Sequence, residues 1–215
     1  YLPRTWLDYS RVLLTGYYPN SASPQQNVYL LDTNKGANQQ SSDLQLLATV
    51  GTQQNVCWDF DSSFDGKTVY INQCNSTSSS SSSTVEAQQT TGSAAPTTVF
   101  SSSTQAITNV RVFEKSDAFI LAATTTGLYK IAVDGTNNAI QLTSVNQGTV
   151  GLNRYSQYFW SNVSRDDSLY ALESYTPGQN TTYNLFFGSM NGSAAQSFAT
   201  ISNGTELEIV GWTTM

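Results

Sequence analysis

Histidine is absent from the chain, and its absence removes several catalytic chemistries at once. Ser-His-Asp triads, Cys-His pairs and metal centres held by imidazole groups all need this residue. The sequence also lacks a Gly-X-Ser-X-Gly nucleophile motif and a glycine-rich phosphate loop. We therefore expect a protein that is not an enzyme, with no catalytic residue, no metal and no cofactor.

Charged residues are also scarce, because they make up 11% of the chain, against about 25% in a typical soluble domain. The 9 basic residues are outnumbered by 15 acidic ones and form no basic run. Binding of nucleic acid needs a cationic face, so we expect no nucleic acid partner. No apolar run approaches the ~20 residues of a membrane span. The chain begins at Tyr1 without a signal sequence, so we expect a mature or excised segment of a parent chain that is a candidate for membrane anchoring.

Only two cysteines are present, Cys57 and Cys74, and they bracket an expected hairpin. Asp65-Gly66 is a strong signal for a two-residue type I′ turn, in which both central residues need a positive φ. A hairpin centred on this dipeptide places Cys57 opposite Cys74, at a non-hydrogen-bonded pair where side chains come closest. We therefore predict a cross-strand disulfide, and two buried free thiols are the alternative.

A disulfide indicates an oxidising compartment, and the sequence holds Asn-X-Ser/Thr sequons that agree with one. The sequons are at Asn75, Asn162, Asn180, Asn191 and Asn203. They are weaker support, because a chain rich in Asn, Ser and Thr forms sequons by chance. These features together predict an extracytoplasmic protein, either secreted or at the cell surface.

An aromatic residue recurs about every 50 residues along the chain, at Trp6, Trp58, Phe113, Trp160 and Trp212. Each opens a short apolar run, and the first four runs end at a polar turn such as Ser63–Gly66. The runs are rich in β-branched and aromatic residues, and none has a helical period with caps. A repeat of this length with four short strands per unit is typical of a β-propeller.

We therefore predict an all-β fold, a propeller of four-stranded antiparallel blades. The blades are expected at about residues 1–50, 51–104, 105–150 and 151–205, with one further strand in residues 206–215. Either the chain belongs to a larger disc, or Glu208–Trp212 has another role at the rim. The sixteen expected strands are Pro3–Leu7, Arg11–Tyr17, Asn27–Asp32, Leu44–Val50, Val56–Asp61, Lys67–Gln73, Thr84–Gln89, Thr97–Ser102, Val110–Glu114, Ala118–Ala123, Gly127–Val133, Ala139–Val145, Tyr158–Val163, Ser168–Tyr175, Thr182–Ser189 and Gln196–Ile201.

The turns and the strands that follow them resemble the repeat of TolB-type, WD40-like propellers. Ser63–Gly66 and Ser164–Asp167 best carry its Ser-X-Asp-Gly turn, and Leu128–Gly135 carries a later strand that ends in Asp-Gly. Unit three departs from the pattern, because Lys115–Asp117 lacks the glycine, and the Gly-His and Trp-Asp marks of true WD40 repeats are absent. The resemblance implies a propeller used for binding or scaffolding, with no shared catalytic residues.

Two features offer other readings. The serine-rich segment Asn75–Ser83 is expected to be a flexible loop, and an O-glycosylated or recognition tract is the alternative. Asp59 and Asp61 lie on one face of an expected strand, where a glycosidase would need two carboxylates. We instead expect Asp61 and Asp65 to shape the turn by hydrogen bonds to the backbone. The start of a calcium loop at Asp61–Gly66 is not completed, because Asn72 stands where a bidentate Glu is needed.

The candidate binding residues are Tyr17, Tyr18, Arg154, Tyr155 and Tyr175. They lie in loops that would share one face of the disc, and Tyr and Arg dominate binding hot spots. If the ring closes at four blades, units one and four are neighbours and these residues form one aromatic patch with a single cation. Ordinary packing within the blades is the alternative.

The predicted function is a non-enzymatic extracytoplasmic binding or sensor module that presents this aromatic loop face to a glycan, peptide or protein partner. The first alternative is a structural subunit of a cell surface or filament. The second is a carbohydrate-active enzyme that would use Asp59 and Asp61.

Overall fold

The computed structural model describes residues 2–17, 26–35, 44–50, 56–76, 81–113, 115–124, 127–144, 149–151, 162–176, 182–193, 195–202 and 212. Within these ranges the secondary structure is almost entirely β, with one short 3-10 helix at Thr33–Lys35. The strands are β1 (Leu2–Trp6), β2 (Arg11–Tyr17), β3 (Gln26–Asp32), β4 (Leu44–Val50), β5 (Val56–Ser62), β6 (Thr68–Ser76), β7 (Ser81–Gln89), β8 (Thr97–Ser102), β9 (Ile107–Val112), β10 (Phe119–Thr124), β11 (Gly127–Ala132), β12 (Ala139–Ser144), β13 (Thr149–Gly151), β14 (Leu169–Thr176), β15 (Thr182–Ser189) and β16 (Gln196–Ser202).

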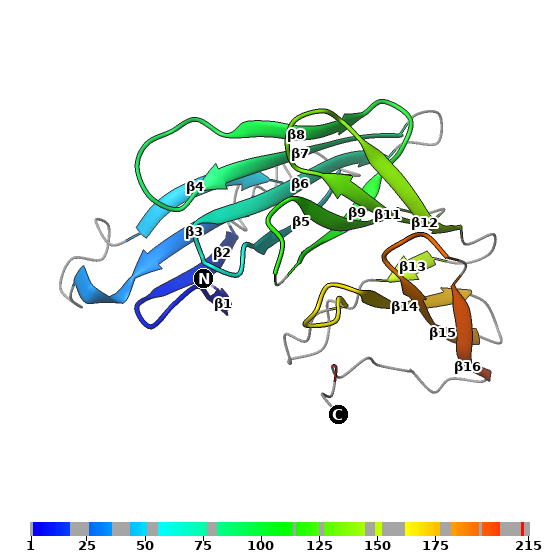
Figure 1. Ribbon diagram of the computed structural model, residues 1–215. Coiled ribbons are helices and arrows are strands. Elements are labelled where there is room, and N and C mark those ends of the chain that lie inside the picture. Colours follow the sequence, from blue (N-terminus) through cyan, green and yellow to red (C-terminus); the bar gives the residue numbers. More distant parts are fainter. Residues whose placement is uncertain are drawn as a thin grey trace.

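These strands form four antiparallel sheets of four strands, and each strand pairs only with its neighbours along the chain. We call the sheets blade 1 (β1–β4), blade 2 (β5–β8), blade 3 (β9–β12) and blade 4 (β13–β16). They follow one another along an arc from blade 1, in blue, to blade 4, in orange (Figure 1). Successive four-stranded meanders of this kind are the blades of a β-propeller, so the predicted fold class is confirmed.

One backbone hydrogen bond recurs in all four blades and defines their common alignment. The residue after the third strand donates its N–H to the carbonyl of the residue before the second strand. The pairs are Thr33 and Ser10 (2.7 Å), Thr90 and Lys67 (2.8 Å), Val133 and Ala118 (3.1 Å), and Met190 and Ser168 (2.9 Å). This bond makes Val12, Val69, Ile120 and Tyr170 equivalent positions of the four second strands.

The aromatic residues that revealed the repeat do not occupy equivalent positions in it. Trp6 pairs with Val12, at the turn end of its hairpin, whereas Trp58 pairs with Gln73, four residues beyond the equivalent Val69. Trp6 comes one residue before Leu7, whose N–H bonds the Arg11 carbonyl, whereas Trp58 comes five residues before Ser63, whose N–H makes the equivalent bond to Thr68. Trp160 lies outside the described residues.

The Cys57–Cys74 disulfide is confirmed. The two residues are directly paired between β5 and β6, with their Cα atoms 5.0 Å apart. The predicted turn type was wrong, because Gly66 has a φ of 66° but Asp65 is not among the described residues with positive φ. Gly66 N–H donates instead to the Ser63 carbonyl at 2.9 Å, and Ser63 N–H donates to the Thr68 carbonyl at 2.8 Å. This four-residue loop has the same centre as the predicted one, so the register is preserved.

The Ser-X-Asp turn has the same internal hydrogen bonds in blades 2 and 4. The Ser63 hydroxyl donates to Asp65 at 2.8 Å and accepts the Thr68 N–H at 2.9 Å. In blade 4 the Ser164 hydroxyl donates to Asp166 at 2.6 Å and accepts the Leu169 N–H at 2.9 Å. Asp167, with a φ of 60°, takes the place of Gly66.

Acid is expected to weaken the protein through these turns. The Lys67 ammonium, its N–H and the Ser63 hydroxyl lower the pKa of Asp65 from 3.8 to about 2. The Ser164 and Ser168 hydroxyls lower the pKa of Asp166 to about 2 as well. A lowered folded-state pKa stabilises the fold above the unfolded value, so this stability is lost as the pH falls from about 4 to about 2. Urea unfolding at several pH values should therefore show a flatter acid slope for an Asp65→Asn, Asp166→Asn variant.

The carboxyl of Asp61 has the opposite effect on stability in acid, so the variant is compared with wild type. Burial raises the pKa of Asp61, against the opposing charge of Arg111, so the folded state binds this proton more readily than the unfolded state, and acid favours folding through Asp61. That contribution is the same in wild type and in the Asp65→Asn, Asp166→Asn variant. Identical acid slopes for the two proteins would show that the turn carboxylates do not control acid stability.

The serine-rich segment is not simply a loop. β6 continues to Ser76 and β7 begins at Ser81, so that only residues 77–80 fall outside the described part. Ser83 is buried; its hydroxyl donates to the Gln105 carbonyl at 2.9 Å and accepts the Ile107 N–H at 2.6 Å. The prediction failed here because pairing with β6 and β8 outweighs the low strand preference of a serine run.

Replacing Ser83 by Ala is expected to lower the free energy of unfolding by about 1–3 kcal/mol, because the buried Ile107 N–H and Gln105 carbonyl lose their partner. Chemical denaturation checks this value. Ser82→Ala is the matched control, since Ser82 is exposed in the same strand. Equal stabilities of the two variants would contradict the proposed role of Ser83.

The first strand of blade 4 also differs from the prediction. Tyr158–Val163 was expected there, but β13 pairs with Glu173–Tyr175 of β14. Val163 forms only an isolated bridge to Tyr170 at the other end of β14. Asn162 belongs to no strand, and residues 158–161 of the predicted strand lie outside the described residues, as does Glu208–Gly211 of the predicted fifth unit.

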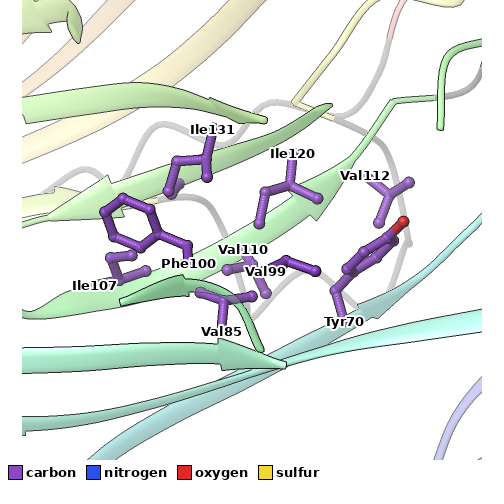
Figure 2. Close-up of a cluster of buried hydrophobic side chains, with 10 residues drawn as sticks. Tyr70, Val85, Val99, Phe100, Ile107, Val110, Val112, Ile120 and Ile131 are labelled. Atoms are coloured by element: carbon purple, nitrogen blue, oxygen red, sulfur yellow. The ribbon is translucent and has the colours of Figure 1, made fainter. Parts of the chain in front are cut away.

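The core lies between the blades. One hydrophobic cluster joins blades 1 and 2, a second joins blades 2 and 3, and a third joins blades 3 and 4. In the second cluster the side chains of Tyr70 and Val85 from blade 2 point toward Val112, Ile120 and Ile131 from blade 3 (Figure 2). Each inner blade is therefore covered on both faces.

Candidate functional site

The predicted aromatic patch remains a prediction. Tyr18, Arg154 and Tyr155 lie outside the described residues. Tyr17 ends β2 and Tyr175 lies in β14, where the structure describes their backbone pairing but not their side chains. None of the hydrophobic clusters of described residues joins blade 4 to blade 1, so closure at four blades gains no support from them.

Asp59 and Arg111 form a buried ion pair between the first strands of blades 2 and 3. Arg111 Nη1 lies 2.8 Å from Asp59 Oδ2, and the two side chains are 14% and 4% exposed. The same oxygen accepts the Val110 N–H and the Asn109 amide, both at 3.1 Å. Asp59 therefore bonds β5 to β9 and has a structural role.

Asp61 lies two residues after Asp59 in β5 and makes contacts of the same kind. Its Oδ2 accepts the Val112 N–H at 2.9 Å, and its Oδ1 accepts the Ser62 N–H at 2.9 Å. Burial alone would lower the pKa of Arg111, but the Asp59 and Asp61 carboxylates raise it above its ordinary value. The two acids are thus held by backbone N–H groups and one guanidinium, which is an arrangement that joins two blades.

The hydrogen bonds predicted for the turn are confirmed at Asp65, whose Oδ1 accepts the Lys67 N–H at 3.0 Å. At Asp61 the prediction was incomplete, because that side chain bonds blade 3 as well as its own strand. The described ranges contain no group of three or more His, Cys, Asp or Glu residues that could hold a metal ion. They also contain no helix long and apolar enough to cross a membrane.

Polar contacts join the other neighbouring blades too. Arg11 of blade 1 donates to the Thr90 hydroxyl at 3.0 Å and to the Gly66 carbonyl at 3.4 Å in blade 2. The Asp167 carboxylate of blade 4 accepts the Lys115 N–H of blade 3 at 2.9 Å. The blades are therefore fixed to one another by hydrogen bonds as well as by apolar packing.

Each blade has one face toward the preceding blade and one toward the following blade. In the second strand, alternate residues point to opposite faces. Val69 and Ile71 of blade 2 contact blade 1, and Tyr170 and Leu172 of blade 4 contact blade 3. By the common alignment, Val12 and Leu14 of blade 1 occupy the same positions, and they point away from blade 2.

The outward face of blade 1 is apolar, and we call it the front face. Its residues are Trp6, Val12, Leu14, Tyr29, Leu31, Leu44 and Leu46. Among the described residues its cluster is made by blade 1 alone. Trp6 is 63% exposed and Leu46 is 52% exposed. Trp6 and Leu46 are therefore exposed at the margin of this face, whereas Val12, Leu14 and Tyr29 on the same face are buried.

The outward face of blade 4 is the other side of the repeat unit, the side opposite to the front face, and we call it the rear face. Its apolar residues are Leu169, Ala171, Leu185, Phe187 and Phe198. Phe198 is 72% exposed, and its ring meets Phe187 edge-on with the centroids 6.4 Å apart. It corresponds to the face by which blades 1, 2 and 3 each contact the next blade.

The sequence analysis missed both end faces. The signal that would have found them is a strand with apolar residues on both sides, such as Leu13-Leu14 in β2 and Phe186-Phe187 in β15. A strand covered on one face alternates apolar with polar residues, so consecutive apolar residues indicate cover on both. In blades 1 and 4, the outward face is not covered by another of the described blades.

The sequons differ in whether they are accessible. Asn162 is buried, and its side-chain amide donates to the Ala171 carbonyl at 2.9 Å, so this residue cannot carry a glycan in the folded protein. Asn75 and Asn191 are exposed. Asn180 and Asn203 lie outside the described residues.

No protein-family model matches the chain, and none of the curated proteins matches it. A search of solved structures returns an oligogalacturonate lyase in complex with manganese, with a TM-score of 0.48 and 10% sequence identity. The match covers 89% of this chain and 74% of that chain.

This comparison contradicts the predicted function, because the solved structure that it returns is an enzyme and not a binding or sensor module. We therefore withdraw the reading of a non-enzymatic module that presents an aromatic loop face. A carbohydrate-active enzyme is not better supported than the withdrawn reading. Asp59 and Asp61, the acids that such an enzyme would use, bond the backbone of β9.

Proposed function

We propose that the chain is an assembly module, a rigid series of blades that is continued at its two end faces by further blades of the same kind. The observation that carries the proposal is the exposure of large apolar side chains at both ends of the series, Trp6 and Leu46 on the front face and Phe198 on the rear face. The front face has the residue pattern that inner blades turn to their predecessor, and the rear face has the pattern that they turn to their successor.

The polar contacts between blades support a mechanical role. The Asp59–Arg111 pair, Arg11 and Asp167 each bond a neighbouring blade. The disulfide adds covalent strength to the β5–β6 hairpin, and its presence supports work in an oxidising, extracytoplasmic compartment. Surface charge is low, so attraction between modules would come mainly from apolar burial.

Association of the purified chain tests this function. We expect concentration-dependent self-association in sedimentation velocity at micromolar protein, weakened at least about tenfold when an aspartate replaces Trp6 or Phe198. Both side chains are exposed, so neither substitution buries a charge in the separate chain. Phe64→Asp is the matched control, because Phe64 is 74% exposed in the β5–β6 turn and lies on neither end face. A chain that stays monomeric, or variants that associate like wild type, would overturn the proposal.

A further inference from the structure

We infer that Asn191 is the acceptor of an N-linked glycan, and that the folded chain can carry this glycan at the turn between β15 and β16. Asn191-Gly192-Ser193 is a complete Asn-X-Ser sequon, a motif that marks surface loops of secreted proteins. The Cys57–Cys74 bond supports the oxidising compartment that secreted proteins enter. The modification is independent of the proposed assembly, because Asn191 lies in a turn and not on an end face.

All three residues of this sequon are exposed. A methyl group on Gly192 would meet no atom within 4 Å beyond its own chain neighbours, so the space beside the turn is open. The Asn162 sequon is the opposite case, because Asn162 and Ser164 are 2% and 6% exposed. A glycan is bulky, so it fits at Asn191 in the folded protein and does not fit at Asn162.

The side chain of Asn191 uses its oxygen in the turn and leaves its nitrogen unused. Oδ1 accepts the Ser193 N–H at 3.0 Å and the Ser193 hydroxyl at 2.8 Å. Nδ2 makes no hydrogen bond within the described part of the chain. Asn162 differs here as well, because its Nδ2 donates to the Ala171 carbonyl at 2.9 Å. An N-linked glycan is attached to the nitrogen, so its attachment at Asn191 leaves the contacts of the turn in place.

The equivalent turn of blade 3 shows that the fold does not need this nitrogen. Asp134 occupies the position of Asn191 in the common alignment. Its Oδ1 accepts the Thr136 N–H at 3.0 Å and the Thr136 hydroxyl at 2.6 Å. The glycines that follow, Gly135 and Gly192, have φ values of 78° and 88°. The same turn therefore forms with a carboxylate, which has no nitrogen, and the amide nitrogen of Asn191 is free for another use.

The reaction is a group transfer without a redox step. The donor is a sugar that is linked through its anomeric carbon to a polyprenyl diphosphate. Asn191 Nδ2 forms a bond to that carbon, and the bond from the carbon to the diphosphate oxygen breaks. The diphosphate leaves with the bonding electron pair, and Nδ2 gives up one proton to a base of the transferase. The Ser193 hydroxyl, by which the motif is defined, lies exposed beside the acceptor.

Mass spectrometry of single sites tests the inference on the chain secreted from a eukaryotic cell behind a cleavable signal peptide. Peptide-N-glycosidase in heavy-oxygen water labels each asparagine that carried a glycan. We expect the label at Asn191 and none at Asn162. A digest without the glycosidase controls for spontaneous deamidation, to which Asn-Gly pairs are prone. An unlabelled Asn191 in the secreted protein would overturn the inference, and a label at Asn162 in folded protein would overturn the argument from burial on which it rests.

Variants of the turn separate the acceptor from the fold. Asn191→Asp removes the nitrogen and should keep the turn, because Thr136 lowers the pKa of Asp134 and so favours a carboxylate at the equivalent position. Ser193→Ala breaks the sequon, whereas Ser193→Thr keeps it and copies blade 3. We expect the glycan mass to be lost in the first two variants and retained in the third, with unchanged far-ultraviolet circular dichroism in all three.

Two results would contradict this assignment. A glycan that persists in Ser193→Ala would show that the modification does not depend on the sequon. A loss of secretion or of the native circular dichroism spectrum in Asn191→Asp would show that the fold needs the amide nitrogen, against the comparison with Asp134.

Discussion

Replacing Asp59 by Ala should lower the free energy of unfolding by about 3–5 kcal/mol, because it leaves the Arg111 guanidinium buried without the carboxylate that it bonds. The substitution also frees the Val110 N–H on the edge of β9. Equilibrium denaturation in urea measures the loss. Asp117→Ala is the control, since Asp117 is an exposed carboxylate in blade 3, and its removal should change stability by less than about 0.5 kcal/mol.

A double variant separates the charge from the packing. Arg111→Met keeps most of the apolar length of the side chain but removes its charge, so Asp59→Ala, Arg111→Met should be more stable than the sum of the single losses predicts. Strictly additive losses would mean that the ion pair has no energetic coupling. A loss below about 1 kcal/mol for Asp59→Ala would show that contacts other than this ion pair stabilise the junction of blades 2 and 3.

The second large effect is expected at the disulfide. Removing it by Cys57→Ala, Cys74→Ala should cost about 3 kcal/mol, because the unfolded chain then regains the freedom of the closed hairpin. The check is thermal and urea unfolding of the variant beside wild type, in the presence and absence of reductant. Reductant should lower the stability of wild type and leave the variant unchanged.

The matched control is wild type with the bond reduced and both thiols left in place. This species should be as weak as the alanine variant within about 1 kcal/mol, because the lost loop closure is common to both. If the alanine variant is as stable as oxidised wild type, the bond contributes no stability. Two thiols that react with an alkylating agent in unreduced native protein would show that the bond is not formed in solution.

Much of the fold was predictable because each blade is specified locally. β2, β4, β8 and β15 have the predicted bounds, and most other strands differ by one to three residues. The Cys57–Cys74 register was also predictable, since it depends on the centre of one short loop. Turn chemistry alone did not fix the loop type, because the Ser63 side chain stabilises a longer turn than Asp-Gly by itself favours.

The sequence predicted less where distant segments decide the structure. Serine residues 81–83 become a strand because all three pair with β6, and Ser83 pairs with Ser102 of β8 as well. β13 occupies the position opposite Glu173–Tyr175 because pairing with β14 selects among several short apolar runs. The candidate site was harder still, since exposure of Trp6 and Phe198 depends on which blades have neighbours, and no local pattern contains that information.

Because strands and blades pair in sequence order, the architecture does not depend on a particular number of blades. In the described part of the chain, every strand pairs with a neighbour along the sequence, and each hydrophobic cluster that joins two blades joins consecutive ones. Nucleation can therefore begin in any blade and spread to the next, as in linear repeat proteins. Gene duplication or loss of one whole unit would break no strand pairing, and the last remaining blade would again present a rear-type face. A chain that is shortened or lengthened by whole units would therefore still allow a further blade to be added at its last one.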